Sequence, residues 1–441
     1  MNWSLAQIAA ITGGTLIGPN ATVSSVGTDS RDVAEGSLFV ALKGEAHDGH
    51  RFVESALAAG AAGVLVERGQ TVEPRVEVED TLAALLALGS ERRNELSIPV
   101  IAITGSSGKT STKDFAVAAL PNAHGSPRSF NNEIGVPLTV LGTPSDAAHL
   151  VMEVGSRGRG HIASLMGAVR PDVAIITNLG VVHMETFGTP AGLAAAKWEI
   201  VDALEESGVA VLPVDEPRLL PPTRVFAGRT ITFGGTGADV AVEGLQLDSR
   251  GCPTFRLSTP IGSGDVQLGV IGAHHALNAA AAVAAGVAVN APLDVMMAGL
   301  TEAQLSPWRM ERHDGRFTVI NDAYNANPDS MAAALRLVAD LPGRSVAILG
   351  KMAELGHLES SEHQRLGRLA SALGFAELII VGEDPGLALG AGAIATSVDS
   401  HDEAAEAARS MVRDGDVVLV KASRSVGLET LASNLAEDAK R

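Results

Sequence analysis

The fold of this chain is decided by one stretch, Val100-Ile101-Ala102-Ile103-Thr104-Gly105-Ser106-Ser107-Gly108-Lys109-Thr110-Ser111. Its first five residues form an apolar run that is rich in β-branched side chains and too short for a helix. Such a run predicts a buried strand. A glycine-rich turn follows at once, and helical sequence begins near Thr112. A strand, a glycine-rich turn and a helix in this order are typical of an α/β domain that binds phosphate.

The residues of this turn suit the chemistry of a phosphate group. The glycines allow backbone N–H groups to converge on phosphate oxygens, Lys109 supplies a positive charge, and the Thr110 hydroxyl is a suitable ligand for Mg²⁺. The strict Walker A pattern of phosphate-binding loops has a further glycine where this chain has Ile103, so the loop is a shortened one. The alternative is an ordinary glycine-rich turn with an exposed lysine. We predict phosphate contacts from Gly105, Ser106, Ser107, Gly108, Lys109, Thr110 and Ser111.

The chain has 441 residues, which is enough for about three domains with well-buried cores. We place these domains at residues 1–96, 97–309 and 310–441. The polar run from Glu91 to Glu95, followed by Pro99, marks the first boundary. The second boundary follows Ser306-Pro307-Trp308-Arg309.

Short apolar runs alternate with helical stretches along the whole chain, which predicts the α/β class. We expect a small α/β N-terminal domain, a central ATPase-type domain with a mostly parallel sheet, and a Rossmann-like, doubly wound C-terminal domain. A glycine fingerprint for dinucleotides is missing from the sequence at a suitable strand end, so nicotinamide chemistry is disfavoured. In the third domain we predict strands at 317–320, 345–349, 377–381 and 416–420, with helices at 330–339, 361–373 and 403–412.

The overall charge and composition exclude several other classes. The balance is 33 − 51 = −18, so a nucleic-acid backbone is repelled and nucleic-acid binding is not expected. A single cysteine, Cys252, rules out an internal disulfide framework. The most apolar tract, residues 276–291, is mostly alanine and shorter than the ~20 residues of a membrane span, so we predict a packed internal helix. We expect no membrane span, a cytoplasmic location and a monomer.

Three further residues are candidates for a metal site, each with a plainer alternative. Glu153 follows the predicted strand 150–152 and offers the hard oxygen ligand that Mg²⁺ prefers, although a solvated carboxylate is the commoner case. His183 lies in a loop after the strand ending at Thr177, where a histidine is more often structural. Lys197 lies in a helical stretch beside Glu199, and the spacing alone predicts a solvent-facing lysine.

Several motifs together resemble the Mur ligase family of ATP-dependent amide-forming enzymes. The resemblance covers essentially the whole chain, in the order of that family's three domains. The motif with the most weight is Asn321-Asp322-Ala323-Tyr324-Asn325-Ala326-Asn327-Pro328-Asp329-Ser330-Met331. Supporting stretches are 28–31, 36–44, the phosphate loop, 349–356 and 420–425.

The resemblance implies roles for individual residues. Lys109 and Thr110 would hold the ATP phosphates and one Mg²⁺, and Glu153 and His183 would hold a second Mg²⁺, supported by a carbamylated Lys197. Further ATP contacts would come from Asn278 at the adenine, Arg309 at the phosphates and Asp322 at the ribose. Asn131 and Asn132 would line the reaction centre, and Tyr324 and Asn325 would contact substrate. The N-terminal domain, residues 1–96, would bind the UDP-sugar part of the substrate, with contacts from Ser30, Arg31, Lys43 and His50.

The implied reaction joins D-alanyl-D-alanine to UDP-N-acetylmuramoyl-tripeptide through an acyl phosphate, in the synthesis of a peptidoglycan precursor. Two alternatives remain open. One is another amide ligase of the same superfamily, either the enzyme that adds the third peptide residue or a folylpolyglutamate synthetase. The other is a non-catalytic phosphate-loop module that binds nucleotide as a switch.

Overall fold

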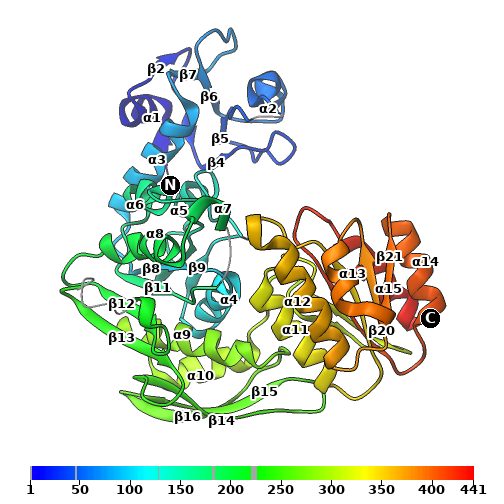
Figure 1. Ribbon diagram of the computed structural model, residues 1–441. Helices are drawn as coiled ribbons and strands as arrows, with labels where there is room; N and C mark the ends of the chain where they lie inside the picture. Colours follow the sequence, from blue (N-terminus) through cyan, green and yellow to red (C-terminus); the bar gives the residue numbers. More distant parts are fainter. Residues whose placement is uncertain (1, 45–46, 128, 181–183, 220–225) are drawn as a thin grey trace.

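The computed structural model describes residues 2–44, 47–127, 129–180, 184–219 and 226–441. The central domain lies between the other two, with the N-terminal domain on one side and the C-terminal domain on another (Figure 1). The expected α/β class and its three-domain order are confirmed, because each domain contains a predominantly parallel sheet with helices packed on it.

The N-terminal domain holds a sheet with the strand order β2-β7-β6-β5-β4 and a small β1-β3 pair. The neighbours from β4 to β7 are parallel, and only β2 runs antiparallel to its partner β7. The strands are β1 (Trp3–Ser4), β2 (Thr15–Ile17), β3 (Thr22–Val23), β4 (Ser25–Gly27), β5 (Ser37–Val40), β6 (Gly63–Glu67) and β7 (Arg75–Val78). The helices are α1 (Leu5–Thr12), α2 (Val53–Ala58) and α3 (Thr81–Glu95).

The polar run at the first predicted boundary forms the end of α3 and is partly buried. Arg92 donates to the Thr143 carbonyl at 3.0 Å, and Arg93 donates to the Val169 carbonyl at 3.0 Å. Arg93 also pairs with Asp172 at 3.2 Å. These contacts fasten α3 to the central domain, so the run is a docking contact rather than a solvated linker.

In the central domain the described strands form a sheet with the order β16-β15-β14-β13-β12-β11-β8-β10-β9. The neighbours from β9 to β14 are parallel, and β14, β15 and β16 form an antiparallel edge. Strand β8 therefore lies between β10 and β11, both of which run parallel to it. The phosphate loop follows the carboxyl end of β8 and so lies beside the carboxyl ends of these two strands. The strands are β8 (Val100–Thr104), β9 (Ala123–Gly125), β10 (His149–Glu153), β11 (Val173–Ile176), β12 (Val209–Pro213), β13 (Arg229–Gly234), β14 (Val240–Leu247), β15 (Pro253–Thr259) and β16 (Gly262–Gln267).

Helices cover both faces of the central sheet. One core contains side chains of α4 (Lys109–Ala119), α9 (His274–Ala288) and α10 (Leu293–Glu302), with Phe115 and all the α9 alanines except Ala288 fully buried. The other core includes α5 (Gly135–Leu141), α6 (His161–Val169) and α8 (Pro190–Asp202), and the short α7 (Met184–Phe187) precedes α8. The predicted internal helix over the alanine tract is confirmed as α9. Among the residues described, no helix has the length and hydropathy needed to cross a bilayer.

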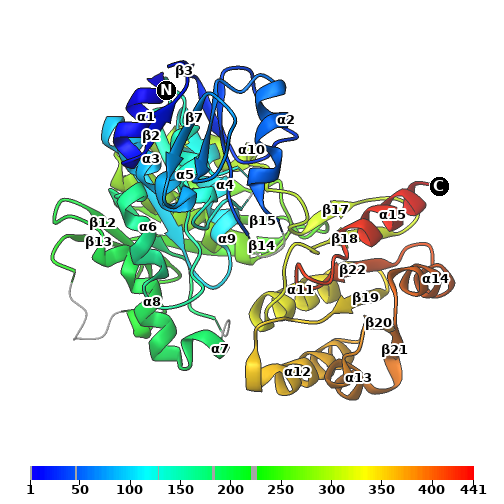
Figure 2. The same cartoon turned by 90° about the horizontal axis from the view of Figure 1, so that it is seen from above.

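The C-terminal sheet has the order β17-β18-β22-β19-β20-β21 and is parallel except at β17. Helices α11, α12 and α13 pack in the core on one face, and α14 and α15 pack in the core on the other (Figure 2). This is the doubly wound arrangement expected from the sequence. The strands are β17 (Glu311–His313), β18 (Thr318–Asn321), β19 (Ser345–Gly350), β20 (Glu377–Val381), β21 (Ala395–Val398) and β22 (Val417–Lys421). The helices are α11 (Pro328–Asp340), α12 (Glu359–Ala372), α13 (Pro385–Ala391), α14 (His401–Met411) and α15 (Glu429–Lys440).

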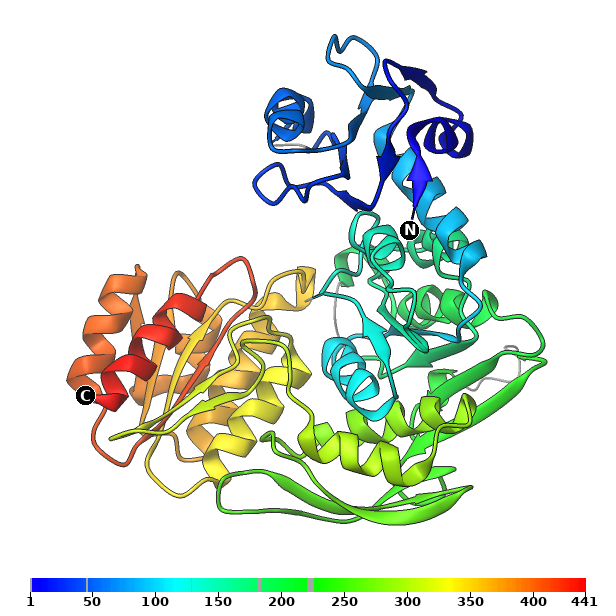
Figure 3. The same cartoon turned by 180° about the vertical axis from the view of Figure 1, so that it is seen from behind.

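The linker between the central and C-terminal domains covers residues 303–310, from the end of α10 to the start of β17. A second connection joins the two domains away from this linker. The β14–β15 end of the central sheet reaches α11, where Cys252 is buried in the same core as Leu337 and Leu341 (Figure 3). A Cβ atom on Gly251 would lie 3.1 Å from each of those two leucines, so the backbone is in close contact with α11.

Two local predictions need correction. Helix α4 begins at Lys109 rather than near Thr112, because Gly108 at φ 76° already forms its N-cap. Glu153 is the last residue of β10 rather than the first residue after it.

The contact between α10 and α4 leaves no room for a side chain at Gly299. A Cβ atom there would overlap the carbonyl oxygen of Ala118. We expect Gly299→Ala to lower the free energy of unfolding by about 1–3 kcal/mol, measured by urea titration, because the two helices must separate. The matched control is Gly167→Ala in α6, where the nearest atom lies at an ordinary 3.4 Å. Equal stability of the two variants would contradict the packing described.

Candidate active site

The phosphate loop is held in shape by the end of β11. Ser107 donates its backbone N–H to the Asn178 side chain at 2.9 Å, and Thr177 donates its hydroxyl to the Ser107 carbonyl at 2.6 Å. A Cβ atom on Gly105, whose φ is 151°, would overlap the Thr177 hydroxyl. The first glycine of the loop is therefore required by a close approach of two strand ends.

A hydrogen-bonded carboxylate lies at the start of α4. Glu153 is 2% exposed, and its Oε2 accepts the Thr110 hydroxyl at 2.5 Å. Its other oxygen accepts the Asn131 amide at 2.7 Å. These contacts bring together three residues from β10, the phosphate loop and the 130–134 loop.

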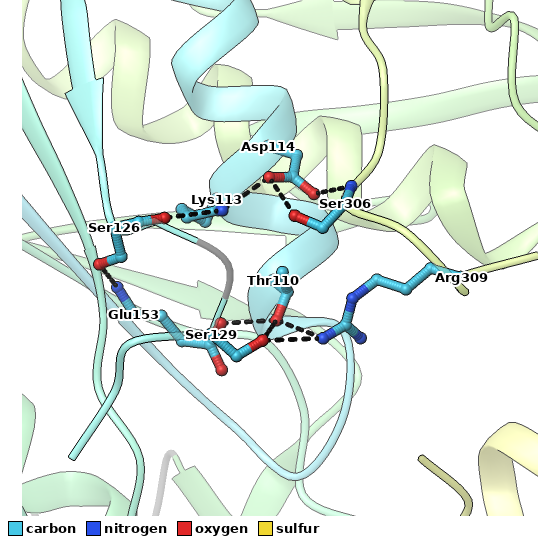
Figure 4. A network of polar contacts seen from close by, with 8 residues as sticks. All are labelled: Thr110, Lys113, Asp114, Ser126, Ser129, Glu153, Ser306 and Arg309. Carbon is cyan, nitrogen blue, oxygen red and sulfur yellow. Dashed lines mark hydrogen bonds and ion pairs between the residues drawn. The ribbon is translucent and has the colours of Figure 1, made fainter. Parts of the chain in front are cut away.

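Arg309 reaches this group from the linker between the central and C-terminal domains (Figure 4). Its Nη2 donates to the Thr110 hydroxyl at 2.7 Å and to the Ser129 hydroxyl at 3.2 Å. The guanidinium also lies 4.0 Å from the centre of the Tyr324 ring, which comes from the C-terminal domain. Arg309 thus places a positive charge beside the phosphate loop.

Two lysines lie close to this guanidinium: Lys109, which is half-buried, and Lys197, which is buried. Burial lowers the pKa of Lys109, and Arg309 acts in the same direction while Glu153 opposes it. The Lys109 ammonium donates to the Gly105 carbonyl at 3.0 Å. Lys197 is 2% exposed, and burial, assisted by Lys109, holds its pKa well below the usual range. The prediction of a solvent-facing Lys197 from spacing alone is wrong, because α8 packs this face against the sheet.

Asn278 lies directly behind the phosphate loop. A Cβ atom on Gly108 would be 2.5 Å from the Asn278 amide oxygen. The amide nitrogen of Asn278 lies 3.3 Å from Nδ1 of His275, which is buried. Burial holds the pKa of His275 well below its usual range, so the ring is neutral.

The predicted C-terminal residues gather near the linker. Asp322 forms an ion pair with Lys421 at 2.6 Å and accepts the backbone N–H of Met310 at 3.1 Å. Lys421 also donates to the Asn325 carbonyl at 2.8 Å, which fixes the loop that carries Tyr324.

The remaining candidates lie apart from this group. Asn132 accepts the Gly135 backbone N–H at 2.9 Å and so supports the start of α5. In the N-terminal domain Arg31 forms an exposed pair with Asp29 at 2.7 Å, and Ser30 and Lys43 lie in nearby loops. His50 uses both ring nitrogens, with Nδ1 2.7 Å from Asp48 and Nε2 accepting from the Glu67 backbone. His183 lies outside the described residues.

Sequence analysis gave no role to several residues that the structure brings to the site. Asn178 and Ser129 are short polar side chains in loops, and nothing in their spacing distinguishes them from turn residues. The sequence did contain one signal for Lys421, which ends a strongly apolar run. A lysine is rarely buried in such a run unless it is paired, so its position indicates a partner with negative charge. Asp114 had another, because it lies four residues after Thr110 and therefore on the same helix face.

The oxygen donors present fit Mg²⁺ by their chemistry. The Thr110 hydroxyl and the Glu153 carboxylate meet at 2.5 Å, and hydroxyl and carboxylate oxygens are the ligands that Mg²⁺ prefers. Within the described parts of the chain, no three His, Cys, Asp or Glu side chains form a metal-binding cluster.

Comparison with protein-family models gives matches in all three domains. A model described as "Mur ligase family, catalytic domain" matches residues 22–101, and "Mur ligase middle domain" matches residues 103–286. A model described as "Mur ligase, glutamate ligase domain" matches residues 308–424.

Individual proteins are similar over nearly the full chain. The UDP-N-acetylmuramoyl-tripeptide–D-alanyl-D-alanine ligase of Escherichia coli is 34% identical, with 99% of this chain and 98% of that protein covered. A crystal structure of MurF from Acinetobacter baumannii has a TM-score of 0.90 at 32% identity, covering 99% of both chains. MurF from Thermotoga maritima, solved in complex with ADP, has a TM-score of 0.84 at 28% identity, covering 95% of this chain and 98% of that one.

The two alternative ligase classes are less similar. A diaminopimelate-adding ligase is 18% identical, with a TM-score of 0.55, and a folylpolyglutamate synthase from Mycobacterium tuberculosis is 20% identical, with a TM-score of 0.65. Likeness at this level concerns the fold alone.

The close contact of Gly108 with Asn278 predicts a strong effect of one added methyl group. We expect Gly108→Ala to weaken ATP binding at least about tenfold, since the loop must move away from Asn278 and from its left-handed φ. Titration calorimetry with ATP measures this change. Gly160→Ala is the matched control, because Gly160 has a similar φ of 81° at a helix N-cap but no atom within 4 Å of the added Cβ. Equal ATP affinity in the two variants would contradict the contact.

Proposed function

The chain belongs to the Mur ligase family, and we propose that it joins D-alanyl-D-alanine to UDP-N-acetylmuramoyl-tripeptide while ATP is converted to ADP and phosphate. The observation that carries this proposal is the likeness to ligases of this specificity over nearly the whole chain. The cations beside the phosphate loop, Lys109 and Arg309, support it independently, since both reactants that would meet there are anions.

The reaction takes place in two steps. An oxygen of the terminal tripeptide carboxylate attacks the γ-phosphorus of ATP, the bond to the β-phosphate oxygen breaks, and ADP leaves. The amine of D-alanyl-D-alanine then attacks the carbonyl carbon of the acyl phosphate and loses a proton, and phosphate departs with the oxygen it received. The products are an amide, ADP and phosphate, which are the products of a peptide ligase.

Residues of this chain bind and orient the charged groups. The Gly105–Ser111 loop and Lys109 would bind the phosphates, with Arg309 beside them as a second cation, which the hydrogen bond from Arg309 to Thr110 supports. Positioned charges in a site of low dielectric stabilise the charge that develops during phosphoryl transfer. Approach of the C-terminal domain, which carries Tyr324 and Asp322, would exclude water from the acyl phosphate.

We assign the metal ligands to Thr110, Glu153, His183 and Lys197. Mg²⁺ bound by these groups supplies positive charge that offsets the repulsion between a carboxylate and a triphosphate. Lys197 suits this role only after modification, because an ammonium group repels a cation. Its lowered pKa favours the neutral amine, which attacks CO₂ and loses a proton to give a carbamate anion. We also propose a monomer in the cytoplasm.

The experiment that tests this function measures ADP formation with UDP-N-acetylmuramoyl-tripeptide, with and without D-alanyl-D-alanine, and weighs the product by mass spectrometry. We expect ADP and a pentapeptide product only when both substrates are present. Activity with a single diamino acid or with glutamate in place of D-alanyl-D-alanine would identify one of the alternative ligases. Nucleotide binding without substrate-dependent phosphate release would indicate the non-catalytic module.

Lys109→Ala tests the phosphate loop in the same assay. We expect kcat to fall at least about 10²-fold, because one positioned cation is removed from the transferring phosphate. The matched control is Lys440→Ala, an exposed lysine at the end of α15, which should keep the normal rate. Full ligation by Lys109→Ala would refute the assignment.

Lys197→Ala tests the carbamate. We expect activity to be lost and then partly restored by a short carboxylic acid that replaces the missing anion, measured as ADP formation against acetate concentration. The same acid should not rescue Lys109→Ala. A ¹³C NMR spectrum of the native enzyme in ¹³CO₂ should show a carbamate signal that disappears in Lys197→Ala. Normal rates in the variant, or a spectrum without that signal, would refute the carbamate.

A further inference from the structure

An ion pair outside the phosphate loop connects the two sides of the site. Lys113 and Asp114 are neighbours on α4, 2.8 Å apart, with side chains that are 6% and 10% exposed. Neither residue was singled out by the motifs or used in the reaction above. Each makes a second contact that leads to a different part of the site (Figure 4).

Asp114 holds the beginning of the linker that carries Arg309. Its Oδ2 accepts the backbone N–H of Ser306 at 2.7 Å, and its Oδ1 accepts the Ser306 hydroxyl at 3.1 Å. Asp114 lies four residues after Thr110, one helical turn further along the same face of α4. Ser306 lies three residues before Arg309. The linker therefore runs antiparallel to α4 and is attached to it at two points.

Lys113 extends the same network to the strand that carries Glu153. Its ammonium donates to the Ser126 carbonyl at 3.1 Å, and the Ser126 hydroxyl accepts the backbone N–H of Glu153 at 3.2 Å. The ion pair thus fixes the Asp114 side chain in place, because a buried carboxylate needs a nearby cation and hydrogen-bond donors.

The linker needs such an attachment, because its backbone is not relaxed. Trp308 and Met310, on either side of Arg309, have φ values of 63° and 52° in the left-handed region. Such conformations persist in residues other than glycine only where the surroundings hold them. After Arg309 the Asp322 carboxylate accepts the Met310 N–H, and before it Asp114 holds Ser306.

We propose that Asp114 is a positioning residue, which holds Arg309 at the phosphate loop by clamping Ser306 to α4. The contacts of Asp114 described above are with Ser306 and Lys113 rather than with the loop glycines, and the proposal assigns its effect on ATP to the contact with Ser306. The proposal rests on the function proposed above, in which Arg309 binds the phosphates. It further implies that Arg309 stays with the central domain when the C-terminal domain moves.

A double-mutant cycle tests this pathway. The variants are Asp114→Ala, Arg309→Ala and the double variant, and the measurements are kcat and the KM for ATP in the ligation reaction. We expect Asp114→Ala to raise the KM for ATP about tenfold, which corresponds to one hydrogen-bonded contact with a charged group. In the Arg309→Ala background the same change should add less than about twofold, because Asp114 then has nothing to position. If the KM of the double variant rises by the full product of the two single-variant increases, the proposal is overturned.

A control variant separates positioning from general stability. Asp172 also accepts a backbone N–H, that of Val100 at 2.8 Å, and pairs with a buried arginine, Arg93. It lies at the opposite end of β8 from the phosphate loop. We expect Asp172→Ala to lower the melting temperature without changing the KM for ATP. If Asp114→Ala behaves in the same way, with an unchanged KM, the proposal is wrong.

Ser306→Ala keeps the test valid if Asp114→Ala does not fold. This variant removes only the hydrogen bond from the Ser306 hydroxyl to Asp114 and should raise the KM for ATP about threefold. When Arg309→Ala is already present, adding Ser306→Ala should leave the KM for ATP unchanged. An unchanged KM would count against the clamp. Calorimetric titration of each variant with ATP distinguishes this inference from the proposed function. If the effects of Asp114→Ala and Arg309→Ala on ATP affinity are independent of each other, the inference is overturned. If these effects are coupled but the enzyme does not ligate the two substrates, only the proposed function is overturned.

Discussion

A concentration of positive charge around one buried carboxylate is the constraint on which the site depends. Lys109 and Arg309 supply this charge beside Glu153, and Lys197, whose pKa burial holds well below its usual range, lies close to them. The whole chain carries a net charge of −18, which opposes the approach of a triphosphate and a peptide acid. The local cations reverse that field at one point, and the low dielectric there strengthens their effect.

The fold supplies these charges from separate elements that end at one edge of a parallel sheet. Strand β10 ends in Glu153, β8 leads into the phosphate loop and Lys109, and α8 carries Lys197. Parallel strands present their carboxyl ends on the same side, which is where open α/β sheets bind ligands. Arg309 is different, because it comes from the linker and its position depends on how that linker is fastened to α4. Its charge therefore links the ATP site to the junction between two domains.

Sequence patterns predicted the structural features that depend on neighbouring residues along the chain. They missed the residues whose burial or contacts depend on how distant elements pack. The phosphate loop, the three α/β domains and α9 followed from local order and periodicity. Lys197 had no local signal, since its burial results from how α8 packs on the sheet, and Arg92 and Arg93 are buried because α3 docks on the central domain. Resemblance to a family supplied Asn278 and Arg309. Ser129, Asn178 and Asp114 were missed because their partners are far away in sequence.

In the proposed reaction the outermost phosphate of ATP is transferred to the peptide carboxylate before the amide forms. The most direct test uses UDP-N-acetylmuramoyl-tripeptide labelled with ¹⁸O in its terminal carboxylate, together with ATP and D-alanyl-D-alanine. Mass spectrometry of the released phosphate should show one ¹⁸O atom per phosphate, because the oxygen that attacked phosphorus leaves with it. Unlabelled phosphate, released while the amide product still forms, would contradict the transfer of phosphate to the peptide carboxylate.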